Sequence, residues 1–193
     1  MSNNLTFHHS WRQSLAVFMQ PKVWVMLLLG FSAGLPIMLI FSSLSIWLLE
    51  AGIQKSEVTY FSWAALGYSF KFVWAPLVDR VPIPWLTRLL GPRRSWMLLA
   101  QCCIVAAIVM MALTDPAQGA SAVLVMAVAA VLLGFSSATQ DIVIDAYRIE
   151  AADADMQAMM SATYIAGYRL GMIVTGAGAL YLAAYFGTTR EHY

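Results

Sequence analysis

Charged residues are scarce in this sequence. They make up 11% of the 193 residues, whereas hydrophobic residues make up 61% and the mean hydropathy is +0.71. A soluble domain carries roughly 25% charged residues, so the few charges present could not cover a water-facing surface. The formal net charge is only +1, which gives no sign of a nucleic-acid partner. The composition therefore predicts a membrane protein.

Histidine and cysteine are also rare, and their positions argue against a metal site or a redox pair. The histidines, His8, His9 and His192, all lie near the chain ends. Cys102 and Cys103 are adjacent within an apolar run, which is more typical of packing residues than of a disulfide. No cluster of histidine, cysteine and carboxylate has metal-ligand spacing. We expect no metal, no cofactor and no catalytic residue.

Long apolar runs dominate what is present. Each run approaches or exceeds the ~20 residues that a helix needs to cross a bilayer. We expect an all-α membrane bundle with a cytoplasmic segment at residues 1–22 and a partial transmembrane bundle at residues 23–193. The predicted spans cover residues 23–49, 58–78, 95–113, 121–147 and 156–186.

The distribution of lysine and arginine predicts the orientation. Seven of these residues lie before the first span, between the second and third, and just after the fourth, whereas two lie on the other side. Positive charge favours the cytoplasmic side of a membrane. The N-terminus is therefore expected in the cytoplasm.

Short sequence matches indicate an internal repeat. Residues 28–32 (LLGFS) recur as residues 132–136, and Gly67-Tyr68 recurs as Gly167-Tyr168. The matches pair the first span with the fourth and the second with the fifth, which cross in opposite directions. Chance is the alternative, since apolar strings draw on few residue types. A three-span unit repeated with inverted topology, as in many secondary transporters, would produce this pairing and would lack its sixth span here.

Four charged residues lie inside the apolar runs: Lys71, Asp141, Asp145 and Arg169. A charge at bilayer depth costs at least ~2.5 kcal/mol, so chains keep such charges mainly where they pair or line a polar cavity. Their formal charges sum to zero. We expect them to belong to a solute or proton pathway.

The fourth span carries the strongest polar pattern. Gly134, Ser137, Asp141, Asp145 and Arg148 follow steps of three and four residues, so they share one helix face, with Gln140 beside it. Two interpretations of the deep charges stay open. In one, Arg169 or Lys71 binds an anionic group of a solute while Asp141 carries a proton. In the other, these residues form a structural ion pair, and Asp145 and Arg148 form a simple surface pair.

Small residues predict close helix contacts. The first span contains Gly30 and Gly34 followed by Pro36, and Gly167 and Gly171 flank Arg169 in the fifth. A G-x-x-x-G spacing lets helices approach closely, and proline removes a backbone hydrogen bond and invites a kink.

The loop after the second span resembles the cytoplasmic loop signature of the major facilitator superfamily. Asp79-Arg80 is followed by Gly91-Pro92-Arg93-Arg94, although a ten-residue insert separates the two parts and Ala75 replaces the first glycine. The resemblance implies a cytoplasmic gating loop in which charges bridge to the end of the fourth span. The residues concerned would be Asp79, Arg80, Arg93, Arg94 and Arg148.

Four longer segments make the resemblance more specific. Residues 29–36, 71–80, 137–146 and 167–172 are similar to the AmpG-type muropeptide permeases, which are major facilitator transporters of Gram-negative inner membranes. The resemblance implies proton-driven import of GlcNAc-1,6-anhydroMurNAc and its peptides into the cytoplasm for peptidoglycan recycling. Such proteins have twelve or more spans. The chain is therefore expected to be the amino-terminal part, with membrane lipid and the missing carboxy-terminal half as partners.

Other function classes remain as alternatives. A related permease could carry another anionic solute, such as acetyl-CoA or a peptide, although acetyl-CoA would need several cations for its phosphates. An intramembrane enzyme could use Asp141 and Asp145 as an acid pair, but no nucleophile–base pair accompanies them. A non-transporting fragment that only packs with a partner is the third alternative.

Overall fold

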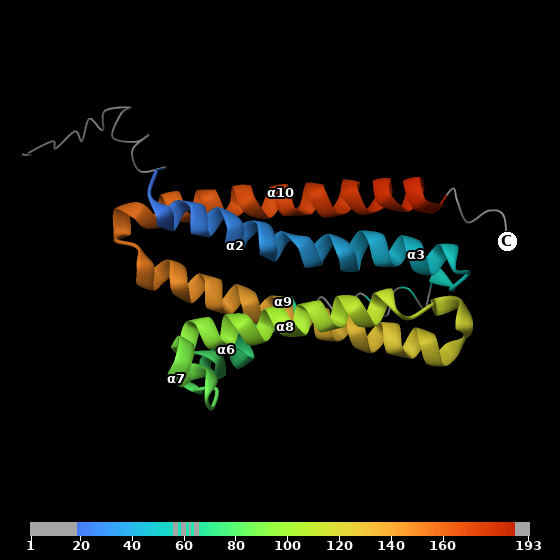
Figure 1. The fold of residues 1–193 in the computed structure, drawn as a ribbon, viewed down its shortest axis with the longest axis horizontal. Helices are drawn as coiled ribbons and strands as arrows, with labels where there is room; N and C mark the ends of the chain where they lie inside the picture. The colour runs from blue at the N-terminus through green and yellow to red at the C-terminus, as the bar shows by residue number, and fades with distance from the viewer. Residues whose placement is uncertain (1–18, 56–57, 59–60, 62, 64–65, 188–193) are drawn as a thin grey trace, which may run out of the picture.

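The computed structural model describes residues 19–55, 58, 61, 63 and 66–187. The described residues form helices joined by short connections, without any strand (Figure 1). This confirms the predicted all-α class. Most of the predicted cytoplasmic segment and part of the predicted second span lie outside the described residues.

The first span is a continuous helical segment in which a π-helix lies between two α-helices. Helix α2 (Pro21–Met38) is followed by the π-helix η1 (Leu39–Leu44) and by α3 (Ser45–Glu50). Pro21 suits the first helical position, where its missing N–H is not needed. Pro36 lies inside α2, and the wider π-type turns begin three residues later. After α3, Gly52 adopts a φ of +83°, and the Ile53 N–H reaches back to the Leu48 carbonyl, which stops the helix.

The second segment is described as two short helices. Helix α5 (Leu66–Ser69) and helix α6 (Lys71–Arg80) are interrupted at Phe70, whose φ and ψ are −103° and 9°. The insert in the basic loop forms a small helix, α7 (Leu86–Leu90), which ends at Gly91 with a φ of +82°. Lys71 therefore begins a new helix rather than continuing the preceding one.

The remaining spans are single long helices. They are α8 (Pro92–Ala112), α9 (Ala120–Ala151) and α10 (Ala154–Gly187), with a short 3₁₀ turn, η3 (Pro116–Gln118), before α9. Among the described residues, four helical segments are long and apolar enough to cross a membrane: Pro21–Glu50, Pro92–Ala112, Ala120–Ala151 and Met156–Phe186. These correspond to the predicted first, third, fourth and fifth spans.

Helix α9 is the central helix of the bundle. It contributes to all three buried apolar clusters: with η1, α3 and α8 through Met126 and Leu133, with α2 and α10 through Ile144, and with α6 through Ile142 and Val143. Figure 1 shows α10 running alongside α2 and α3, and α9 running alongside α8. Polar residues on α9 are thus enclosed by several neighbours.

Helices α2 and α10 touch backbone to backbone. Each helix contributes two glycines to this contact: Gly30, Gly34, Gly167 and Gly171. A Cβ atom added at Gly30 would overlap the Tyr164 carbonyl, and one added at Gly167 would overlap the Leu27 carbonyl. Only glycine allows helices to pack this closely.

The glycine contacts also relate the two halves of the sequence repeat. A Cβ atom on Gly167 of α10 would lie 3.0 Å from the Phe31 nitrogen of α2. A Cβ atom on Gly67 of α5 would lie 3.2 Å from the Phe135 nitrogen of α9. The second segment therefore meets the fourth where the fifth meets the first, which is the arrangement that an inverted repeat predicts.

Candidate functional site

The polar face of α9 points into the bundle. Ser137 and Gln140 are 3% and 1% exposed, and the Asp141 side chain is 14% exposed. One turn further toward the C-terminus of α9, the Asp145 side chain is 44% exposed. The face therefore runs from a half-open end near Asp145 to a closed interior at Ser137.

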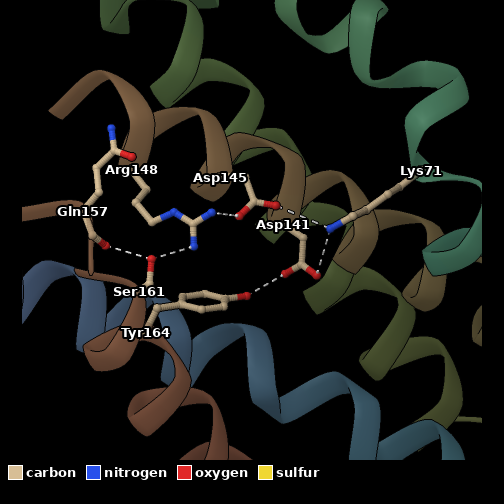
Figure 2. Close-up of polar contacts among 7 residues, drawn as sticks. All are labelled: Lys71, Asp141, Asp145, Arg148, Gln157, Ser161 and Tyr164. Atoms are coloured by element: carbon tan, nitrogen blue, oxygen red, sulfur yellow. Dashed lines mark hydrogen bonds and ion pairs between the residues drawn. The ribbon is translucent and has the colours of Figure 1, made fainter. Parts of the chain in front are cut away.

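One lysine serves two carboxylates on this face. The Lys71 Nζ atom, from the first turn of α6, lies 3.9 Å from Asp141 Oδ2 and 3.5 Å from Asp145 Oδ2 (Figure 2). On the other side of Asp141, the Tyr164 hydroxyl donates a hydrogen bond of 3.1 Å to Oδ1. Helices α6, α9 and α10 thus meet at Asp141.

A second cation completes the network. An Arg148 guanidinium nitrogen lies 3.3 Å from Asp145 Oδ1, and another donates to the Ser161 hydroxyl at 3.2 Å. Ser161 in turn donates to the Gln157 carbonyl at 2.8 Å (Figure 2). Two carboxylates and two cations therefore make a neutral cluster in which Lys71 stands at one end and Arg148 at the other.

Arg169 does not belong to this cluster. From the sequence, we expected Lys71 and Arg169 to neutralise the two aspartates of α9. In the structure, Lys71 and Arg148 do so. Arg169 is exposed and forms no ion pair with any residue that the structure describes. The reason is helical geometry: Arg169 lies two residues from Gly167 and from Gly171, which face α2, and two residues turn a helix by ~200°. Its side chain therefore leaves the opposite side of α10.

A separate ion-pair group joins residues of the basic loop for which the sequence predicts a gating role. Arg93 at the start of α8 pairs with Asp79 at the end of α6 and, at 2.6 Å, with Glu150 at the end of α9. The sequence singled out Asp79 and Arg93 but missed Glu150. Arg148 points to Asp145 and Ser161 instead of bridging this loop, and Arg80 and Arg94 are exposed and form no ion pair within the described segments.

Deeper in the bundle, several polar atoms lack a partner. Gln140 donates to the Ser32 hydroxyl of α2 at 3.2 Å, but its carbonyl oxygen accepts nothing from the described residues. The Ser137 and Tyr68 hydroxyls are also buried; they lie near one another, but within the described residues neither makes a hydrogen bond of ordinary geometry. Buried polar atoms are normally satisfied, so this is where a solute group or water would be held.

Sequence reasoning missed the polar residues that α10 contributes to this cluster. Gln157, Ser161, Tyr164 and Tyr168 follow steps of four, three and four residues, which place them on one helix face. This periodicity was a usable signal for Ser161 and Tyr164. The sequence offers no comparable signal for Glu150 or for Ser32, because each becomes relevant only through a contact with a distant helix.

Comparisons with known proteins agree with this arrangement. The family model described as acetyl-coenzyme A transporter 1 matches residues 22–185. The anhydromuropeptide permease of Escherichia coli is 38% identical over 171 residues, which cover 89% of this chain and 33% of that protein. A Rickettsia felis protein named "Putative transporter AmpG 4" is 42% identical over 175 residues, which cover 91% of this chain and 41% of that protein.

The chain thus spans less than half the length of these relatives. They are named as transporters and a permease rather than as enzymes, and the AmpG-type resemblance found in the sequence is confirmed. With several helices able to cross a bilayer, the chain is part of a multi-pass membrane protein. It belongs to the acetyl-coenzyme A transporter 1 family and is similar to the AmpG transporters.

Proposed function

We propose that this chain forms part of a proton-coupled permease that imports anhydromuropeptides, GlcNAc-1,6-anhydroMurNAc and its peptides, across the inner membrane. The observation that carries the proposal is the 38% identity, over 89% of the chain, with a protein named anhydromuropeptide permease. The imported sugars would serve peptidoglycan recycling. The N-terminus would lie in the cytoplasm, as the distribution of lysine and arginine favours.

Asp141 is the proposed proton carrier. It is the least exposed carboxylate of the cluster and stands at the junction of three helices. A carboxylate can take up and release a proton, whereas an arginine keeps its charge under all conditions. Gln140, Lys71 and Asp145 are proposed to line the same solute and proton pathway, whereas Arg169, expected there from the sequence, leaves the opposite side of α10.

The cytoplasmic ion pairs are proposed to act as a gate. Arg93, with Asp79 and Glu150, ties together the ends of α6, α8 and α9 at one side of the bundle. These side chains are partly exposed, so each pair is worth little alone. Contacts of this strength can open and re-form during a transport cycle.

Uptake measurements test the proposal. The protein that contains this chain is produced from its complete reading frame in cells that lack their own muropeptide permease. We expect accumulation of labelled GlcNAc-anhydroMurNAc that stops when an uncoupler collapses the proton gradient. Uptake that survives full uncoupling would contradict proton coupling, and no uptake at all would contradict the permease assignment.

The family model favours acetyl-CoA as the second candidate solute. Acetyl-CoA carries several phosphate charges, and the cations at the polar face of α9 are Lys71 and Arg148, of which Arg148 is already paired with Asp145. Competition decides between the two: excess unlabelled acetyl-CoA should leave uptake of the labelled disaccharide unchanged. Strong inhibition would favour the second candidate.

A further inference from the structure

The Asp141 and Asp145 carboxylates both lie near the single ammonium group of Lys71, which cannot pair fully with both at once. Lys71 is shared between two carboxylates, at 3.9 Å and 3.5 Å. Asp145 already has a second cation, since Arg148 lies 3.3 Å away. Lys71 is therefore needed mainly by Asp141, and that need disappears whenever Asp141 carries a proton.

We propose that Lys71 binds a carboxylate group of the transported solute, and that a proton on Asp141 frees it to do so. This inference rests on the proposed function and names the residue that would recognise the solute. With Asp141 neutral, Lys71, Arg148 and Asp145 carry a net charge of +1. A solute carboxylate restores neutrality, so proton and anion enter the site together.

Accessibility singles out Lys71 among the cations. Its side chain is 36% exposed, so a solute can reach it, and it begins α6 directly after the break at Phe70. Arg148 is held by both Asp145 and Ser161. Arg169 stands on the other side of α10 and has no acid beside it in the described part of the chain to exchange for a solute. The lysine stem is long and can move its ammonium between partners.

The groups around Asp141 leave Lys71 as its partner of opposite charge. Asp145 lies on the same helix, Tyr68 and Lys71 approach from α5 and α6, and Tyr164 and Tyr168 approach from α10. Helix α2 contributes no charged side chain here; its Ser32 contacts the neighbouring Gln140. The pH dependence of solute binding is therefore expected to follow Asp141.

Two matched solutes test the inference. The disaccharide GlcNAc-anhydroMurNAc carries a free lactyl carboxylate, and its N-methyl amide is neutral. We expect the wild-type protein to take up the carboxylate form with a KM about ten- to hundredfold lower, the range typical of a charged hydrogen bond. Lowering the pH should reduce the KM of the carboxylate form further and leave that of the amide unchanged.

Variants of single charged residues show which side chain gives the preference for the carboxylate form of the disaccharide. Lys71→Gln should reduce the carboxylate preference to less than about threefold, Lys71→Arg should keep part of it, and Arg88→Gln, which removes an exposed charge from α7, should keep all of it. Asp141→Asn should keep the preference, make the KM independent of pH and abolish accumulation against a gradient.

The outcomes separate the two proposals. An unchanged carboxylate preference in Lys71→Gln overturns the role of Lys71 while the permease stands. Wild-type protein that takes up neither solute overturns the proposed function itself, and the role of Lys71 with it. If Lys71→Gln does not reach the membrane, the charge-balanced double variant Lys71→Gln with Asp141→Asn is measured instead, and a retained preference there overturns the inference.

Discussion

At the residue scale, Asp141 shows why a charge inside an apolar helix needs several partners. Lys71 supplies an opposite charge, and Tyr164 supplies a hydrogen bond from the other side. Removing one partner of a buried pair costs ~3–5 kcal/mol because the other charge is left uncompensated. Since Lys71 is about one-third exposed, water screens part of that cost.

A double-mutant comparison follows from this geometry. Asp141→Asn should lower the stability of the detergent-solubilised protein by about 1–3 kcal/mol, which is less than a fully buried pair would lose. Adding Lys71→Gln should restore part of that loss, because Asp145 and Arg148 then form a cluster without net charge. Adding Arg169→Gln should restore nothing, since Arg169 is not part of the cluster. Thermal unfolding and the amount of membrane-inserted protein measure both effects. Equal recovery by both second changes would contradict the pairing.

The loop residue Glu150 gives a second prediction. Glu150→Gln leaves Arg93 with Asp79 alone and loosens α9 from α8 and α6. We expect a several-fold drop in the maximal uptake rate with little change in solute KM, because the residue lies far along α9 from Asp141. The Arg88→Gln variant serves as the control for a lost loop charge. A raised KM at an unchanged maximal rate would contradict the gating role.

At the scale of helices, the apolar runs were enough to predict the first, third, fourth and fifth spans. They could not predict where each helix ends: α9 extends to Ala151, beyond the predicted 147, because a helix can continue past the bilayer edge with charged residues. The break at Phe70 and the π-type turns of η1 also escaped prediction. Hydrophobicity predicts neither of them, and Pro36 predicts only a kink near η1.

The glycine contact between α2 and α10 can be tested with a matched pair on one helix. Gly167→Ala places a methyl group onto the backbone of α2, whereas Gly178→Ala meets no atom within 4 Å. Overpacking of this kind typically costs ~1–3 kcal/mol, and the methyl group cannot move aside from backbone atoms. Thermal unfolding should show a clear loss for Gly167→Ala and none for Gly178→Ala. Similar behaviour of the two variants would mean that α2 and α10 are not in backbone contact.

At the scale of the whole molecule, the sequence located the candidate site but did not predict which charged side chains pair with one another. The steps of three and four residues along α9 placed Ser137, Asp141 and Asp145 on one face without any knowledge of the fold. Which cation balances which acid depends on the rotation of α6 and α10 about their axes, and a single sequence does not contain that information. The sequence therefore favoured Arg169 as the partner of Asp141 and kept Lys71 as the substitute, whereas the structure places Lys71 there.

The orientation of the bundle gives the last prediction. The Arg93 ion pairs and the basic α7 loop lie at the same end of the bundle as the start of α2, where Lys22 donates to the Ala151 carbonyl at 2.7 Å. Gln54 follows α3, at the other end of the first span. Positive charge retained on the cytoplasmic side should place Gly91 inside and Gln54 outside. Reporter fusions active only in the cytoplasm or only in the periplasm should therefore give opposite signals at these two positions. Equal signals would mean that the second segment, which lies between the two positions, does not cross the membrane. Gly91 outside would invert the bundle. The Asp145 end of the charged cluster, rather than its Ser137 end, would then lie on the side from which the proposed solute enters.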